Sequence, residues 1–504
     1  MFTKNPRFLY GICLLLFFVA LDGIAAPPDR TLVEAAQSRS ANTVQELLEQ
    51  GANVNTLGPD GTTALHWAVY WDDEEMVDLL LEAGAEVNAR NELGATPLWL
   101  ASVEGRASMV EVLLAAEADP NLSLLMGETS LMAASRAGST DAVTALLDNS
   151  ADVNARERTR GQTALTWAVS EKHAGVVRLL VKHGAKVNAR SAVRRMFWNT
   201  GSDGGRDPES MVWLDDGGFT PLLHAARVGD IASAEILLAA GADVDEQTPQ
   251  GATPLAIAVF SGHTAVGELL LSKGADPNAA GAGYAPLHAA ILRGDATMVR
   301  ALLAHRADPN ARLQAGTGYG RGANDWFLSW LWIDATPIWL AARLSEVNIM
   351  GILAEVGAET HVVKKGGTNL VMAPIALIRE RGSRAGKRSP EEEKRDRPEA
   401  KLDAVRTALG FSIDVNMTDD DGNTALHMAA THGLNPVVQL LVERGAAINV
   451  KNNEDKTPLM LALASERQRD SDDEAASDEL STADLLRQLG AMEPPAEEPV
   501  EPGV

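Results

Sequence analysis

Histidine is the side chain in this sequence that could most readily bind a metal or act as a general base near neutral pH. The 504 residues include ten histidines and a single cysteine, Cys13. A zinc site of the finger type joins closely spaced histidines to cysteines, and no cysteine lies near any of these histidines. His224 stands in an apolar stripe, where a lone histidine is usually a packed core residue. We therefore predict no metal site.

Two other stretches partly match known binding loops. Residues 199–210 begin like a calcium loop, but Ser210 stands where the twelfth position needs an acidic ligand. Residues 316–322 are rich in glycine and lack the spacing of a phosphate-binding loop. We find neither a G-x-S-x-G motif nor a nucleophile with a suitable base. The sequence therefore predicts no catalytic residue, no cofactor and no enzymatic activity.

Arginine and aromatic residues gather in two stretches that are suited to binding another protein. Such side chains commonly anchor protein interfaces. The two stretches hold five of the ten tryptophans. We predict that a partner binds the following residues: Arg194, Arg195, Phe197, Trp198 and Trp213 in the first stretch, and Tyr319, Arg321, Trp326, Phe327, Trp330 and Trp332 in the second.

Two interpretations of these aromatic stretches remain open. In the first, they are fingers that bound a trough, and they stand roughly 25 to 30 Å apart because three helical layers separate them. In the second, each stretch folds back and buries its apolar side chains against neighbouring units. A carbohydrate-binding or enzymatic site between the fingers is a further alternative, since aromatic rings stack well on sugars.

A sequence pattern that recurs about every 33 residues must position both stretches. In the unit that opens at Gly61, Thr63 can cap a first helix, and a second helix carries Leu80 on its apolar face. Gly84 ends the second helix, because glycine adopts the left-handed backbone without a clash. The same opening recurs at Gly94, Gly127, Gly161, Gly218, Gly251, Gly283, Asp334, Gly366, Gly422 and Asp455.

The pattern resembles the ankyrin repeat, whose opening reads T-P-L-H-x-A. The resemblance extends over residues 29–490 and includes a degenerate first unit before Gly61. It implies an all-α solenoid of about twelve helix-turn-helix units with short β-hairpin-like loops, two longer aromatic insertions and a protein-binding role. It also implies that His66, His288 and His427 bind neighbouring backbone through their rings.

Four insertions interrupt the repeat, at about residues 191–217, 312–333, 381–399 and 468–480. The first two are the aromatic stretches, and both follow an Asn-Ala-Arg sequence. The last two are charged and lack aromatic residues, so we expect solvated or disordered loops. Residues 491–504, rich in proline and glutamate, are expected to form a disordered tail. The unit that opens at Gly366 is the weakest match, and we expect it to open first.

The N-terminus has the features of an export signal. Lys4 and Arg7 precede an apolar run from Phe8 to Leu21, and a small-residue cleavage site ends at Ala25. We predict that residues 1–25 are a cleaved signal peptide, and an uncleaved membrane anchor is the alternative. The run is shorter than the roughly 20 residues that span a bilayer, so we expect no membrane span after cleavage.

A formal net charge of −25 argues against a nucleic-acid partner, because phosphate binding needs a basic surface. We predict an exported, periplasmic or secreted, monomeric scaffold that binds one or more proteins and does not catalyse a reaction. A secreted effector that acts on another cell's proteins is the alternative within the binding class.

Overall fold

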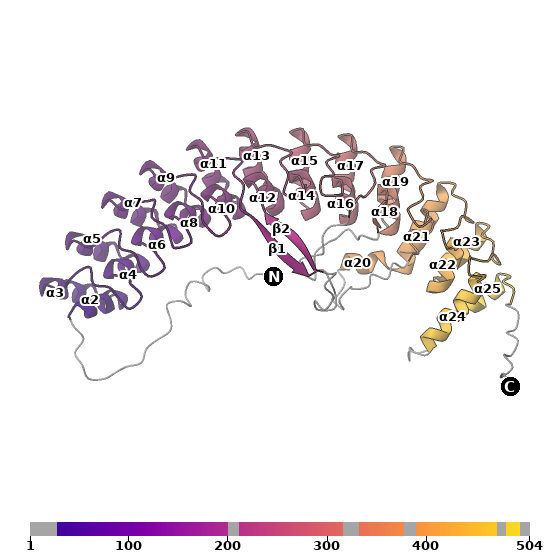
Figure 1. The fold of residues 1–504 in the computed structure, drawn as a ribbon, viewed down its shortest axis with the longest axis horizontal. Helices are drawn as coiled ribbons and strands as arrows, with labels where there is room; N and C mark the ends of the chain where they lie inside the picture. Colours follow the sequence, from indigo (N-terminus) through magenta and orange to yellow (C-terminus); the bar gives the residue numbers. More distant parts are fainter. Residues whose placement is uncertain (1–27, 200–210, 316–331, 377–389, 471–479, 494–504) are drawn as a thin grey trace. The chain divides into compact units, whose positions relative to one another are not determined.

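The computed structural model describes residues 28–199, 211–315, 332–376, 390–470 and 480–493 (Figure 1). The chain divides into two compact regions, Met1–Asp152 (region 1) and Val153–Val504 (region 2), and each contains several repeat units. Within each region, helices come in antiparallel pairs, and each pair packs on the pairs before and after it in the sequence. The predicted all-α repeat solenoid is confirmed.

Region 1 contains four helix pairs. An inner row of helices packs together, with α4 between α2 and α6, while α7 and α9 pack in the outer row. The eight helices are α2 (Pro28–Gln37), α3 (Ala41–Glu49), α4 (Ala64–Trp71), α5 (Glu74–Glu82), α6 (Pro97–Val103), α7 (Ala107–Ala115), α8 (Ser130–Ala137) and α9 (Thr140–Asp148).

Region 2 has the same arrangement of helix pairs and also contains one two-stranded antiparallel ribbon. The ribbon consists of β1 (Val193–Asn199) and β2 (Met211–Gly217). The helices are α10 (Ala164–Ser170), α11 (Ala174–Lys182), α12 (Pro221–Val228), α13 (Ile231–Ala239), α14 (Pro254–Ser261), α15 (Thr264–Ser272), α16 (Pro286–Arg293), α17 (Ala296–Ala304), α18 (Pro337–Arg343), α19 (Val347–Glu355), α20 (Pro390–Arg395), α21 (Pro398–Gly410), α22 (Ala425–His432), α23 (Asn435–Glu443), α24 (Pro458–Asp470) and α25 (Thr482–Gln488).

Threonine caps fix where the inner helices begin, as the sequence predicts. The Thr96 hydroxyl accepts a hydrogen bond from the backbone N–H of Trp99 at 3.1 Å, which satisfies a donor that the helix itself leaves free. Pro97 occupies the first helical position, where no N–H is needed. The same cap is made by the predicted Thr63 and by Thr129, Thr163, Thr220 and Thr253.

Buried histidines join some neighbouring units, as the family resemblance implies. His66 Nδ1 accepts a hydrogen bond from the backbone N–H of Thr63 at 3.1 Å, so Nε2 carries the proton and donates to the Ala95 carbonyl at 3.1 Å. His427 makes the equivalent bond to the Lys456 carbonyl of the next unit, whereas the His288 ring bonds to the Ala311 carbonyl, later in its own unit. Burial lowers the pKa of His288 to about 4 and keeps its ring neutral.

Asparagines in the turns after the outer helices form a second link between units. Asn88 donates to the Glu117 carbonyl at 3.3 Å and accepts from the Asp119 N–H at 2.8 Å. Asn55, Asn121, Asn154, Asn278 and Asn416 make the same pair of bonds one unit further on. Each asparagine satisfies one free carbonyl and one free N–H, so the turns stay in register.

Three parts of the chain differ from the expected pattern. The first aromatic insertion forms strands, which the sequence analysis did not predict. The unit that opens at Gly366 has turns where other units have an inner helix, and Asn369 accepts from the N–H groups of Val371 and Met372. Helix α20 lies inside the charged stretch expected to be a loop, and its last residue, Arg395, pairs with Glu346 at 2.7 Å. Sequence composition alone does not reveal that contact.

Candidate functional site

The two aromatic insertions leave the repeat at equivalent positions. The backbone N–H of Ser191 donates to the Phe219 carbonyl, and that of Leu313 donates to the Ala335 carbonyl, each at 2.9 Å. Both bonds join a residue at the start of an insertion to the residue that follows the next unit's opening. The two insertions therefore begin and end at equivalent positions of their repeat units.

An arginine closes the base of each insertion. Arg190 Nη1 donates to the Gly218 carbonyl at 2.9 Å, and its other nitrogen pairs with Glu246. Arg312 Nη1 donates to the Asp334 carbonyl at 3.1 Å and lies 2.8 Å from the Asp334 carboxylate. The role of these two arginines was not predicted, because Asn-Ala-Arg also occurs at residues 88–90 and 154–156, where no insertion follows.

The β1/β2 ribbon begins directly above this closure. Val193 pairs with Gly217 at its base, and Figure 1 shows the ribbon running away from the row of helices. Gly217 has a φ of 105°, and a Cβ there would lie 2.0 Å from the Ala192 carbonyl oxygen. Only glycine therefore fits where the returning strand rejoins the repeat.

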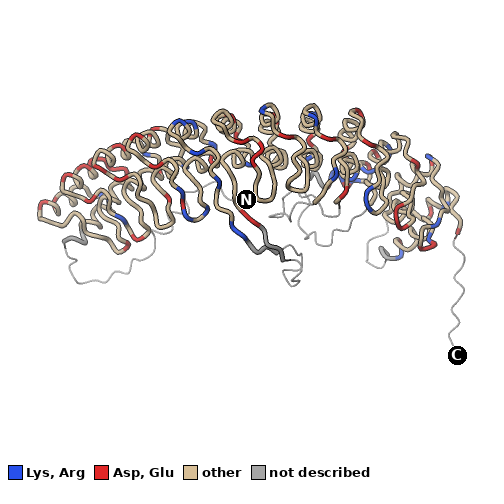
Figure 2. The backbone as a smooth tube through the Cα atoms, turned by 45° about the horizontal axis from the view of Figure 1, so that its top comes forward, with Lys and Arg blue, Asp and Glu red and all other residues tan. Residues whose placement is uncertain are grey.

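Opposite charges face each other across the first part of the ribbon. The register pairs Arg194 with Asp216 and Arg195 with Asp215, and Figure 2 shows blue on β1 and red on β2 at this point. Cross-strand pairs of opposite charge stabilise a two-stranded ribbon. Arg194 also donates to the Thr159 carbonyl in the turn before α10. Both predicted arginines are exposed and lie together at the base of the ribbon.

Glu157 shapes the turn that lies beside the ribbon. Its buried carboxylate accepts from the backbone N–H groups of Thr159, Arg160 at 2.7 Å and Gln162 at 3.0 Å. The turn carries three exposed arginines, Arg156, Arg158 and Arg160, and Arg156 also donates to the Arg190 carbonyl. The turn at residues 156–162 and the two strands together contain five Arg against three Asp and Glu, so this edge has a net positive charge although the whole chain is acidic.

The other predicted site residues have different outcomes. The backbone of Phe197 pairs with that of Trp213, and Trp198 belongs to the same ribbon, but these three side chains lie outside the described part of the structure. Tyr319, Arg321, Trp326, Phe327 and Trp330 lie outside the described residues altogether. Trp332 is only 6% exposed, so it packs within the protein. This corrects its place among accessible binding residues, because its ring is covered where the insertion returns to the repeat.

Phe219, which lies between β2 and α12, forms a packed group with two side chains of α12. The Phe219 and His224 rings lie 5.3 Å apart, and the Arg227 guanidinium lies 5.0 Å from the centre of the Phe219 ring. Arg227 also donates to His224 Nδ1 at 3.4 Å. Burial, together with Arg227 and Arg160, lowers the pKa of His224 to about 3. His224 is therefore a neutral core residue, as predicted.

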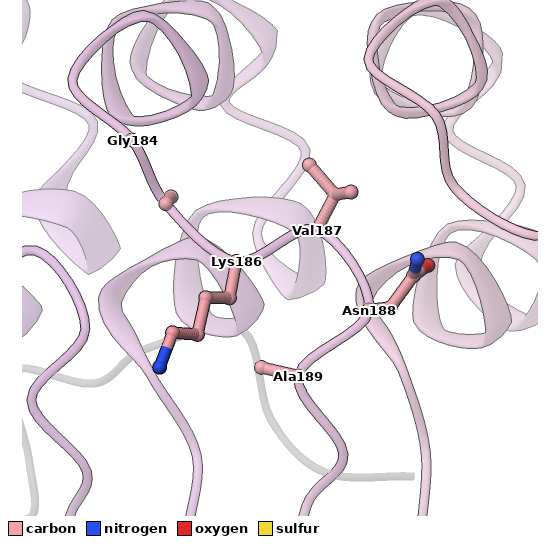
Figure 3. Close-up of a pocket in the computed structure, with 6 residues that line it drawn as sticks. Gly184, Lys186, Val187, Asn188 and Ala189 are labelled. Carbon is pink, nitrogen blue, oxygen red and sulfur yellow. The ribbon is translucent and has the colours of Figure 1, made fainter.

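An open depression of about 500 Å³ lies after α11 and is lined by residues 184–189 (Figure 3). Figure 3 shows the side chains of Lys186 and Asn188 pointing away from each other. Asn188 is already bonded to Gly241 and Asp243. Small-molecule sites usually converge several polar groups on one point, and this depression does not.

Metal binding and membrane crossing also find no candidate in the described residues. Among them, no three His, Cys, Asp or Glu side chains are placed to hold a metal ion. No helix in the same ranges is long and apolar enough to cross a membrane.

Paired helices in register, with segments inserted at one edge, define this chain as an all-α repeat protein. Two family models match its sequence: Ankyrin repeats (3 copies) at residues 32–123, 98–191, 204–281 and 222–313, and Ankyrin repeats (many copies) at residues 408–462. The first model covers more than half of the chain, so the chain belongs to the ankyrin-repeat family.

Curated relatives resemble short parts of the chain. An ankyrin repeat-containing protein of Schizosaccharomyces pombe is 35% identical over 63 residues, 12% of this chain and 30% of the relative. A putative ankyrin repeat protein of fowlpox virus is 34% identical over 64 residues, 13% of this chain and 34% of the relative. A serine/threonine-protein kinase of Arabidopsis thaliana is 37% identical over 65 residues, 13% of this chain and 14% of the kinase. The match thus spans about a third or less of each relative.

Proposed function

We propose that this protein is an exported, non-catalytic scaffold that binds protein partners at the edge formed by the β1/β2 ribbon and the turn at residues 156–162. Ankyrin repeats imply protein binding, and the proposal adds a location to that general role. We define these two segments together as the ribbon edge.

One observation carries the proposal: the repeat closes beneath the ribbon without using it. Arg190 binds the Gly218 carbonyl, and Asn188 binds Gly241 and Asp243, so the units before and after the insertion are already joined. A two-stranded ribbon is at best marginally stable alone and gains most from a further strand or surface. A protein partner can supply that surface by pairing with a free strand edge.

Charge supports the same location. Arg156, Arg158 and Arg160 are exposed beside Arg194 and Arg195, and the ribbon edge has a net positive charge in a chain of net charge −25. Arginine forms charge-assisted, often paired, hydrogen bonds with carboxylates. The ribbon edge therefore favours a partner segment that carries acidic side chains.

Export is proposed from residues 1–25 alone. Their basic start, apolar run and small residues near Ala25 have the order of a cleaved signal peptide. Fractionating cells and sequencing the N-terminus of the product tests this point. Cleavage after Ala25 supports export, and an intact Met1 in the cytoplasm contradicts it. Retention in the periplasm favours a resident scaffold, and release into the medium favours an effector.

The binding role is tested by capturing partners with three forms of the mature chain: the parent, a variant with a shortened ribbon and a control. The variant replaces Arg195–Asp215 by Asn-Gly, a sequence that makes a tight hairpin turn and keeps the Arg194–Asp216 pair. The control, Arg300→Gln, changes an exposed arginine of α17 and leaves the ribbon edge intact. We expect the control to retain a specific partner and the shortened ribbon to lose it. Equal capture by all three forms would contradict the proposed location.

A further inference from the structure

Three large apolar side chains are exposed together in region 1, which ends at Asp152. Leu93, Leu125 and Met126 are 59%, 58% and 65% exposed, and they stand at the tips of two consecutive turns. The backbone N–H of Leu125 donates to the Leu93 carbonyl at 3.0 Å, so the two tips are neighbours. We call these three residues the apolar tip patch.

The apolar tip patch has a firm foundation. Each tip is closed by a backbone bond of 2.8 Å, from Gly94 to the Asn91 carbonyl and from Gly127 to the Leu124 carbonyl. Arg90 reaches across and donates to the Ser123 carbonyl at 2.6 Å. Leu124, in the second turn, packs on a buried cluster around Trp99. A partner would therefore meet a pre-formed surface and lose little free energy in ordering it.

Large apolar residues are unusual at this position of the repeat. The residue immediately before the opening position is polar, charged or small in most units, as with Asp60, Arg160, Gln250, Asp421 and Glu454. Packing within the unit does not require Leu93 or Met126 at the tip, because more than half of each side chain lies in solvent. Adjacent exposed apolar groups of this kind commonly mark a contact surface.

Charge identifies the kind of partner. Residues 28–152 contain five Arg and no Lys against 21 Asp and Glu, a net charge of −16. Four described arginines of region 1 already contact other groups of this region: Arg39 lies over Trp71, Arg90 binds the Ser123 carbonyl, Arg106 binds the Val69 carbonyl, and Arg136 pairs with Glu128. Asp60 and Glu92, which flank the patch, are exposed, and the Glu92 N–H bonds to the Asp60 carbonyl at 3.0 Å.

We infer that the apolar tip patch binds a cationic polypeptide segment whose Lys or Arg residues alternate with large apolar ones. The apolar side chains cover Leu93, Leu125 and Met126, and the cations face the surrounding carboxylates. Long-range attraction of the cationic segment to the acidic region 1 raises the association rate, while the apolar contact determines the residence time. This inference rests on the proposed protein-binding role and uses a surface separate from the ribbon edge.

The test measures fluorescence anisotropy of a labelled 16-residue peptide of alternating Arg and Leu, titrated with the full mature chain. The protein variant combines Leu93→Ser, Leu125→Ser and Met126→Ser. The control combines Val356→Ser and Val363→Ser, which change two exposed apolar residues of region 2. We expect the tip variant to bind at least tenfold more weakly and the control to match the parent. A peptide with Ser for Leu, or with Glu for Arg, should lose binding to the parent chain.

Three results would overturn the inference. Equal affinity of the parent and the tip variant would show attraction to net charge alone. Equal binding of the Glu-containing peptide would show that charge does not select the partner. A chain that sediments as a dimer through the patch, and binds no peptide, would show that a second copy covers it. None of these results alters the ribbon edge, so failure here is distinguishable from failure of the proposed function.

Discussion

Asn188 and Asp243 are hydrogen-bonded although 55 residues separate them: the Asn188 side-chain oxygen accepts from the Asp243 N–H at 3.2 Å. The same side chain donates to the Gly241 carbonyl at 3.3 Å. In uninterrupted units this pair of bonds joins residues about 30 positions apart, as for Asn88 and Asp119. The first insertion therefore leaves the contact between its two flanking units unchanged.

Shortening the β1/β2 ribbon should change stability little. With Arg195–Asp215 replaced by Asn-Gly, the bonds of Asn188 and Arg190 remain, so we expect an unfolding free energy within about 0.5 kcal/mol of the parent. Thermal and urea unfolding measure this. A steep fall in the melting temperature would instead support the interpretation that the insertion folds back and covers neighbouring repeats.

Asp245 occupies the position of the linking asparagines but can make only one of their two bonds. It accepts from the Asp276 N–H at 3.0 Å, whereas a carboxylate cannot donate to the Gly274 carbonyl. Asp245→Asn should restore the donor and raise the unfolding free energy by about 1 kcal/mol. The reverse change, Asn278→Asp, removes a 3.0 Å bond to the Arg306 carbonyl and should lower stability by a similar amount. Opposite shifts in urea midpoint are expected; no change in either would contradict this role.

Ala285 stands where most inner helices have a capping threonine. Helix α16 has no side-chain cap there, although His288 is placed as His66 is beside Thr63. Ala285→Thr should supply the missing acceptor and stabilise the protein by about 1 kcal/mol. Thr253→Ala, which removes the 3.2 Å cap of α14, is the matched opposite. If both variants melt at the parental temperature, the caps do not limit stability.

His224 should make the protein less stable in acid. Its pKa is about 3 in the folded chain, below the ordinary 6.5, so its contribution to stability is complete above pH 6.5 and is lost as pH falls toward 3. At pH 5 the loss is about 2 kcal/mol.

His224→Leu removes the titrating group and keeps an apolar side chain, as Leu340 does in the equivalent slot. Urea unfolding at pH 7 and pH 5 should show a smaller difference between the two pH values for the variant. An unchanged pH dependence would mean that His224 is not the titrating group.

Much of the fold can be predicted from sequence because each unit repeats the same local chemistry. Thr96 followed by Pro97 fixes a helix start, and the 33-residue period places every later unit. The turns that Glu117, Ser150 and Arg306 form with φ of 65°, 66° and 69° follow from the glycines found there in other units.

The site is harder to predict because it departs from the repeat. The strands of the ribbon had a local signal, since residues 193–199 and 211–217 are rich in apolar, aromatic and β-branched residues. The closure by Arg190 and the turn organised by Glu157 depend on contacts that composition does not reveal. Burial of Trp332 likewise depends on how the second insertion returns to its unit.

Hydrogen–deuterium exchange of the full mature chain, with and without its captured partner, tests the central claim most directly. We predict slower exchange in residues 193–199, 211–217 and 156–162 when the partner is bound, with little change in the outer helices α13 and α15. Protection confined to those outer helices, with the ribbon exchanging as it does in the free protein, would contradict binding at the ribbon edge.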